Sequence, residues 1–143
     1  KYQILCNIKL IMKNNVLKMI KYLYYFSLII LFVLYLFPGS LIGHLLYGDL
    51  GKQPNIIDNP IGTSINHLIF FMYLSSLGLI VRSNAKSFFN SFYFLLGISI
   101  LLELLHLIVP NRAFEYYDLF ANSVGVVTVY FIWLIYLKFN ILN

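Results

Sequence analysis

Four long apolar runs separated by shorter polar connections restrict what this chain can fold into. The runs cover residues 22–37, 64–81, 91–109 and 118–137. Each is close to the ~20 residues that an α-helix needs to cross a hydrocarbon core of ~30 Å. None alternates apolar and polar residues in the way that strands of a transmembrane β-barrel do. The sequence therefore predicts an all-α membrane protein with four transmembrane helices in one bundle.

The composition supports this class. Of the 143 residues, 61% are hydrophobic and 10% are charged, which is too little charge to cover the surface of a soluble domain. We expect one domain over residues 22–138, preceded by a basic segment over residues 1–21. Met12 is a candidate native start, and the single Cys6 cannot form a disulfide within the chain.

The basic residues are distributed unequally between the two sides of the predicted bundle. Eight of the ten Lys and Arg residues flank one side, and only Lys52 and Arg112 fall on the other. The positive-inside rule then places both termini in the cytoplasm and turns the loops 39–63 and 110–117 outward. We predict a multi-pass protein of the bacterial inner membrane that contacts membrane lipids. The basic residues are topological flanks, so no nucleic-acid partner is predicted.

A second feature is a set of polar residues in or beside the apolar runs, all predicted near the outer side. Glu103 and His106 are three residues apart, and Asp118 and Asn122 are four apart, so each pair shares one face of its helix. The full set of candidate site residues is His67, Glu103, His106, Arg112, Asp118 and Asn122. Ionisable groups within a membrane are costly and usually face the bundle interior or a wet cavity.

Two interpretations of this set remain open. In one, the residues line an outward-facing polar pocket between the second, third and fourth predicted helices. In the other, they form a buried network that only holds the helices together, since polar side chains act as interhelical glue at ~0.6–2 kcal/mol each.

The sequence contains no clear catalytic or metal-binding motif. The three histidines and Glu103 have side chains that can bind zinc, but no HExxH or other tight ligand spacing occurs, so we predict no metal and no cofactor. Glu103 with His106 or His67 could form an acid–base pair on a lipid head group. Ser64 and two other hydroxyl residues, Thr63 and Ser123, are candidate nucleophiles without a motif.

At these positions the sequence resembles the VanZ-like family of small bacterial membrane proteins. His67 opens a span and is followed by Leu-Ile-Phe-Phe, Glu103 lies inside a span, and Pro110-Asn111-Arg112 precedes Asp118-x-x-x-Asn122-x-x-Gly125. The resemblance covers roughly residues 60–135. The chain departs from the family pattern where Thr63-Ser64 replaces Asp-Lys, where His106 replaces Gln, and where Val129 replaces a glycine.

The resemblance implies a four-helix membrane protein of the cell envelope with a family link to antibiotic resistance, namely to the glycopeptide teicoplanin. It supplies no reaction. Our leading hypothesis is that the outward polar pocket binds a lipid or a lipid-linked envelope precursor. The first alternative is an accessory or structural subunit of a larger membrane protein complex. The second is a small membrane enzyme that acts on lipid head groups, which we rank last because no nucleophile or metal motif is found.

Overall fold

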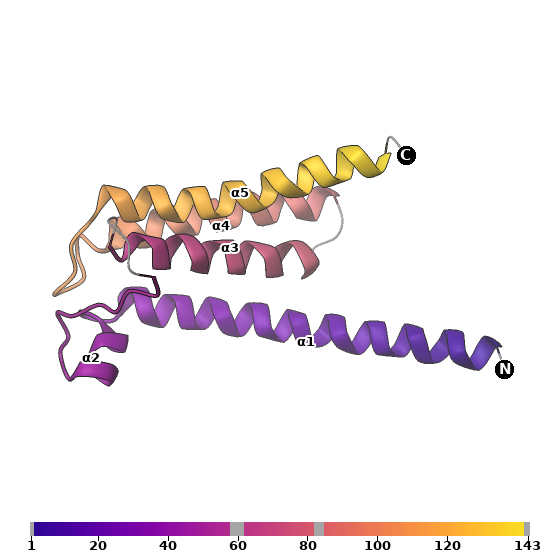
Figure 1. Ribbon diagram of the computed structural model, residues 1–143, viewed down its shortest axis with the longest axis horizontal. Coiled ribbons are helices and arrows are strands. Elements are labelled where there is room, and N and C mark those ends of the chain that lie inside the picture. Colours follow the sequence, from indigo (N-terminus) through magenta and orange to yellow (C-terminus); the bar gives the residue numbers. More distant parts are fainter. Residues whose placement is uncertain (1, 58–61, 82–84, 142–143) are drawn as a thin grey trace.

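The chain folds into α-helices. The computed structural model describes residues 2–57, 62–81 and 85–141, and every regular element within these ranges is an α-helix (Figure 1). The five helices are α1 (Tyr2–Leu36), α2 (Leu41–Tyr47), α3 (Ser64–Val81), α4 (Ala85–Leu105) and α5 (Tyr116–Ile141). The predicted all-α class is therefore confirmed for the described part of the chain.

Three of these helices are long and apolar enough to cross a membrane. Within the described residues they are Asn14–Leu36, Ser64–Val81 and Tyr116–Phe139, and a shorter apolar helix covers Asn90–Leu105. Many of their large apolar side chains are exposed on the outside of the bundle, as expected where lipid is the solvent. The chain is thus a multi-pass membrane protein by length and composition of its helices, and the fourth span stays a prediction.

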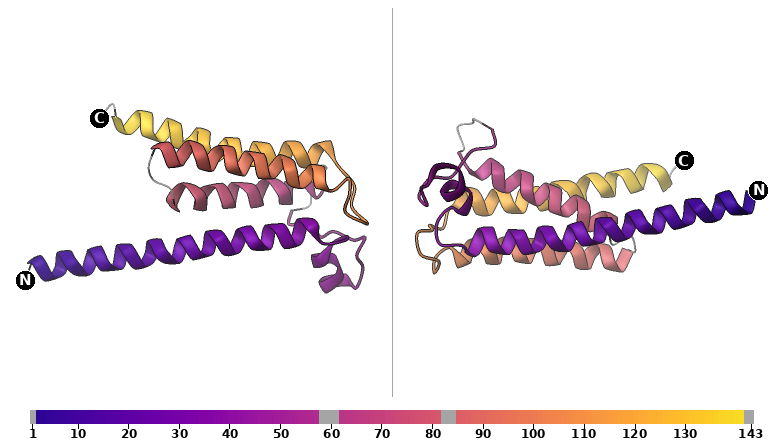
Figure 2. Two further views of the ribbon diagram at one scale, coloured as in Figure 1. Left: turned by 180° about the vertical axis from the view of Figure 1, so that it is seen from behind. Right: turned by 90° about the horizontal axis from the view of Figure 1, so that it is seen from below.

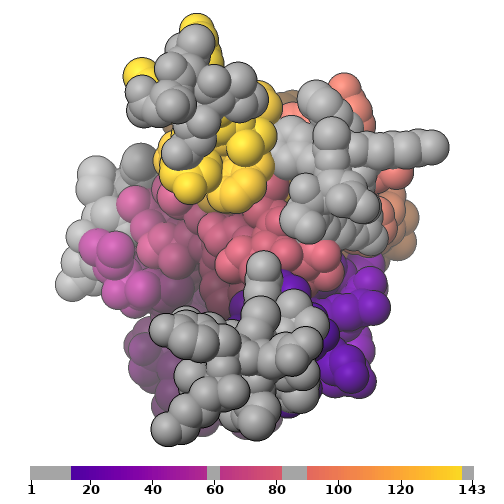
Figure 3. All heavy atoms as spheres, turned by 90° about the vertical axis from the view of Figure 1, so that its right-hand side faces the viewer, coloured from indigo at the N-terminus to yellow at the C-terminus, as the bar shows by residue number. Residues whose placement is uncertain are grey.

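The four long helices run alternately up and down. Figures 1 and 2 show that α1 begins and α5 ends at one end of the bundle, while α2 and the connection between α4 and α5 lie at the other. Viewed from the first of these ends, α5 and α1 lie on opposite sides with α3 and α4 between them (Figure 3). The closest packing is between α3 and α5.

Glycine allows this close packing of α3 and α5. A Cβ atom added to Gly125 would lie 2.7 Å from the Leu68 carbonyl oxygen and 3.1 Å from the Phe71 Cβ. The same interface buries Phe71, Leu74 and Val126 completely. Because small residues let helix backbones approach in lipid, this contact can fix the register of α5 against α3.

The helix ends differ in detail from the predicted runs. The third predicted run extends to residue 109, but α4 ends at Leu105, and His106 lies in the turn that follows. There the His106 backbone N–H donates to the Glu103 carbonyl oxygen over 3.1 Å, which tightens the end of the helix. At the other extreme, α1 continues the first run backward through the basic segment to Tyr2.

The long loop after α1 folds back on itself around α2. Ser40 caps α2, since its hydroxyl accepts a 2.9 Å bond from the Gly43 backbone N–H, and its own N–H donates to the Leu50 carbonyl oxygen over 2.7 Å. Gly43 packs directly against the Lys52 carbonyl, where a Cβ would not fit. These contacts hold α2 beside the end of α1 (Figure 1).

Gly125→Ala should destabilise the bundle through the α3–α5 contact. Overpacking typically costs about 1–3 kcal/mol, which outweighs the ~1 kcal/mol that alanine adds in helix propensity. We expect a lower thermal unfolding temperature in detergent. The matched control is Gly97→Ala in α4, where an added Cβ meets nothing within 4 Å. Equal unfolding temperatures for the two variants would contradict the proposed role of Gly125.

Candidate functional site

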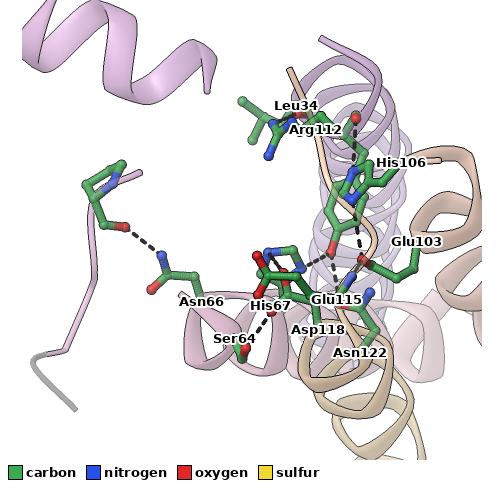
Figure 4. A network of polar contacts seen from close by, with 12 residues as sticks. Leu34, Ser64, Asn66, His67, Glu103, His106, Arg112, Glu115, Asp118 and Asn122 are labelled. Carbon is green, nitrogen blue, oxygen red and sulfur yellow. Dashed lines mark hydrogen bonds and ion pairs between the residues drawn. The ribbon is translucent and has the colours of Figure 1, made fainter. Parts of the chain in front are cut away.

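The six polar residues singled out in the sequence converge at the end of the bundle that carries α2. His67 comes from the first turn of α3, Asp118 and Asn122 from the first turns of α5, and Glu103 and His106 from the end of α4 (Figure 4). These five are buried, with Glu103 and Asn122 completely inaccessible. Arg112, from the loop between α4 and α5, is half-buried beside them.

Tyr35 of α1 lies at the centre of this polar cluster. Its hydroxyl donates to Asn122 Oδ1 over 2.8 Å and lies 2.5 Å from His67 Nδ1. The Tyr35 hydroxyl therefore connects His67 of α3 with Asn122 of α5. The Tyr35 ring also stacks on His106, with 5.3 Å between ring centroids. The site therefore involves α1 in addition to the three helices expected from the sequence.

Both buried carboxylates accept hydrogen bonds from neighbouring groups. Asp118 Oδ1 accepts from the Ser64 hydroxyl over 2.5 Å, and Asp118 Oδ2 lies 3.4 Å from His67 Nε2. Glu103 Oε1 accepts from the Glu115 backbone N–H over 3.1 Å. It also lies 3.4 Å from His106 Nδ1.

Arg112 caps the end of α1. Its Nη2 donates to the Leu34 carbonyl oxygen over 2.8 Å, and its Nε lies 3.5 Å from the Phe37 carbonyl oxygen. These carbonyls lack partners within the helix, and a cation is favourable at this end of the helix dipole. Burial lowers the pKa of the Arg112 guanidinium from its ordinary value, and the charges of Glu103 and other acidic neighbours oppose this shift. Arginine nevertheless stays charged.

Glu115 also interacts electrostatically with the cluster. Partial burial raises the pKa of its carboxyl group above the ordinary value, and the nearby charges of Asp118 and Glu103 raise the pKa further. Its side chain is largely exposed and its backbone N–H bonds to Glu103. The Glu115 carboxyl group is thus electrostatically linked to the buried cluster as well as bonded to it through the backbone.

Two cavities meet at the cluster. The larger has a volume of about 670 Å³ and lies between α1, α2, α3 and the loop after α2. Its walls are mostly apolar, and they end at Tyr35, His67, His106 and Arg112. A smaller cavity of about 210 Å³ is lined by polar groups of the loop around α2 and of the loop between α4 and α5, and it reaches Asp118. Together the two cavities have an apolar part and a polar part, and the polar cluster lies where they meet.

Three members of the cluster have the chemistry of metal ligands. One ligand atom each from His67, Glu103 and Asp118 lies within 4.8 Å of the others, and all three residues are buried. Within this cluster, Glu103 Oε2 and Asn122 Nδ2 are buried without a hydrogen-bond partner among the described residues. Buried polar atoms without partners are uncommon, and a bound water or another polar group would satisfy these two.

The sequence alone did not identify two important contributors. Tyr35 sits at the end of an apolar run, where a tyrosine is usually read as an interfacial residue. Ser64 was considered as a nucleophile, but its hydroxyl donates to Asp118 and so supports a carboxylate. The signal that could have identified Tyr35 is its position near the end of the first run, at the same end of the bundle as the other polar residues.

A bundle of long apolar helices with buried ionisable residues at one end defines a multi-pass membrane protein. The sequence profile of the VanZ/LLP1 family matches residues 8–137, and the chain belongs to this family. The match extends the resemblance noted over residues 60–135 to include the first helix and Tyr35. Comparison with curated proteins and with solved structures gives no significant match.

Tyr35→Phe should destabilise the bundle because it leaves His67 and Asn122 without their shared partner. Orphaned buried groups cost about 1–3 kcal/mol, although hydrogen bonds between membrane helices average nearer ~0.6 kcal/mol. We expect a lower unfolding temperature in detergent. The control is Tyr25→Phe in the same helix, where the side chain is 43% exposed. If both variants unfold at the wild-type temperature, Tyr35 does not organise the site.

Proposed function

We propose that this protein binds an anionic amphipathic molecule of the bacterial envelope, a lipid or a lipid-linked precursor, in the larger cavity and the adjoining polar cluster. The observation that carries this proposal is the cavity of about 670 Å³, whose apolar walls end at charged and polar side chains. Its volume falls within the ~300–1,000 Å³ of typical ligand pockets.

The walls of the larger cavity suit an alkyl or prenyl chain. On one side they consist of apolar residues of α1, among them Leu31 and Leu34, and on the other of Ile69 and Phe70 in α3. A chain lying between α1 and α3 would exchange contact with membrane lipid for contact with protein, at little cost in apolar hydration. Specificity must therefore come from the polar end of the ligand.

Arg112 is the group that favours an anionic head. In the described part of the chain no carboxylate lies within salt-bridge distance of its guanidinium, whose hydrogen bonds go to backbone carbonyls. It lines both cavities together with Ser40, Gln53 and His106. Arginine binds phosphate and carboxylate groups by paired charge-assisted hydrogen bonds. A phosphate-bearing lipid would place its head here and its chain in the larger cavity.

The excess of basic residues at the opposite end supports an outward orientation of this site in the inner membrane. A pocket on that side would meet lipids and lipid-linked precursors of the outer leaflet. The link of the VanZ-like family to teicoplanin resistance, which the resemblance implies, fits a role in the cell envelope.

The two alternatives receive less support. For a head-group enzyme with a serine nucleophile, the hydroxyl should face a general base, whereas Ser64 donates to Asp118 and no histidine lies within hydrogen-bond distance of its oxygen among the described residues. An accessory subunit would need no cavity connected to its buried cluster.

Native mass spectrometry of the protein, gently extracted from its own membrane, tests the proposal. We expect a bound lipid or precursor on the wild type and its loss in Arg112→Ala, which removes the cation at the head. Ile69→Trp, which fills the apolar cavity, should displace the same ligand without altering the polar cluster.

Two matched controls make the result specific. Lys52→Ala removes the other cation expected on that side, and Ile80→Trp adds the same ring to an exposed position of the same helix. Both should keep the ligand. A wild type without lipid, or a ligand that all four variants retain, would contradict the pocket. A stable complex with a larger membrane protein would instead favour the accessory subunit.

A further inference from the structure

Three side chains from three different helices direct acceptor atoms toward one point. His67 of α3, Glu103 of α4 and Asp118 of α5 each offer one ligand atom, and these atoms lie within 4.8 Å of one another (Figure 4). Imidazole nitrogen and carboxylate oxygen are both common ligands of Zn²⁺. The residues are far apart in the sequence, so no ligand spacing could reveal them.

Each of the two histidines presents one ring nitrogen to a carboxyl group. His67 Nδ1 is hydrogen-bonded to the Tyr35 hydroxyl, and its Nε2 lies 3.4 Å from Asp118 Oδ2. His106 Nε2 lies 3.2 Å from the Tyr35 carbonyl oxygen, and its Nδ1 lies 3.4 Å from Glu103 Oε1. The second nitrogen of each ring is thus held by Tyr35, which leaves His67 Nε2 directed at the carboxyl groups.

One carboxyl oxygen of the cluster is left without a partner. Glu103 is completely buried, and its Oε2 has no hydrogen-bond partner among the described residues. Arg112 gives its hydrogen bonds to the Leu34 and Phe37 carbonyl oxygens and forms no ion pair with Glu103 or Asp118. A metal ion bound between the carboxyl groups would give this buried oxygen a partner.

Both histidines pack against the same Tyr35 ring, with centroid distances of 5.2 Å and 5.3 Å. A single divalent cation bound between the carboxyl groups would offset the charge of both and could use the unpartnered Glu103 oxygen.

The surrounding contacts resemble the outer shell of a metal site. His67 Nδ1 is hydrogen-bonded to the Tyr35 hydroxyl, Asp118 accepts from Ser64, and Glu103 accepts from the Glu115 backbone. Such partners orient metal ligands and fix the histidine tautomer. We infer that His67, Glu103 and Asp118 bind one Zn²⁺ ion, with Nε2 of the histidine and the two carboxylates as ligands.

This site would keep a coordination position for water or for an anionic group, as zinc sites with three protein ligands do. His67 lines the larger cavity and Asp118 lines the smaller one, so the ion would lie where the two cavities meet. The inference does not depend on lipid binding. Zinc binding without a bound lipid would support the metal site and contradict the proposed function. A bound lipid without zinc would support the proposed function and contradict the metal site.

Metal analysis of the full chain tests the site. Protein purified in mild detergent without chelator should contain one zinc per chain, and the chelator-stripped protein should take up Co²⁺ with a visible absorption band. Glu103→Gln and Asp118→Asn keep the side-chain size but weaken the ligand, so both should lose the metal and the band. Ser64→Ala should weaken binding about 10–100-fold, as loss of an outer-shell partner does.

Exposed residues of the same types serve as controls. His44→Gln and Asp49→Asn remove an imidazole and a carboxylate at the surface of the α2 region and should retain the full metal content. Loss of metal in His44→Gln would assign the ion to the surface and overturn the inference. A wild type that takes up neither ion, or ligand variants that bind as well as the wild type, would also overturn it. Should a ligand variant fail to fold, the wild type and Ser64→Ala still decide.

Discussion

The burial of two carboxylates in an apolar bundle is the constraint on which the rest of this structure depends. Glu103 and Asp118 cannot face hydrocarbon, so α4 and α5 must turn these residues inward at the same depth. Once inside, each needs donors, which come from α3 and from the loop before α5. Tyr35 then joins α1 to both α3 and α5. One end of the bundle is therefore specified by polar contacts, whereas Gly125 and apolar packing specify its middle.

The position of the cluster at the helix ends supplies groups that a site deeper in the membrane would lack. Carbonyls at the end of α1 remain free to accept bonds from Arg112, and the Glu115 N–H before α5 remains free to donate to Glu103. Backbone groups that would otherwise need water thus stabilise charged side chains. The same arrangement opens the cluster to the two loops at this end of the bundle, since residues of the loop around α2 line both cavities.

The sequence predicts the long helices well because each apolar run is bounded by turn-forming or charged residues. The run 64–81 coincides with α3. The position of each polar residue relative to the end of its apolar run placed all six at the same end of the bundle, and there they meet. Aromatic residues were harder to interpret. Tyr24 reads as an interfacial residue but is completely buried, and Tyr35 became central only through its contacts. Hydropathy does not distinguish a tyrosine that faces lipid from one that faces the interior.

The chemical nature of the cluster favours a ligand over a purely structural role. Neutral amides and hydroxyls can connect membrane helices at lower cost than charges, and buried ion pairs are often replaceable by apolar residues without loss of stability. The tight contact of Gly125 against α3 already holds α5 in place away from the cluster. Helix association alone does not require so many ionisable groups. The junction of the two cavities holds two carboxylates, two histidines and a half-buried arginine. Such an excess of costly charge is expected where the protein must bind an ion or a charged head group.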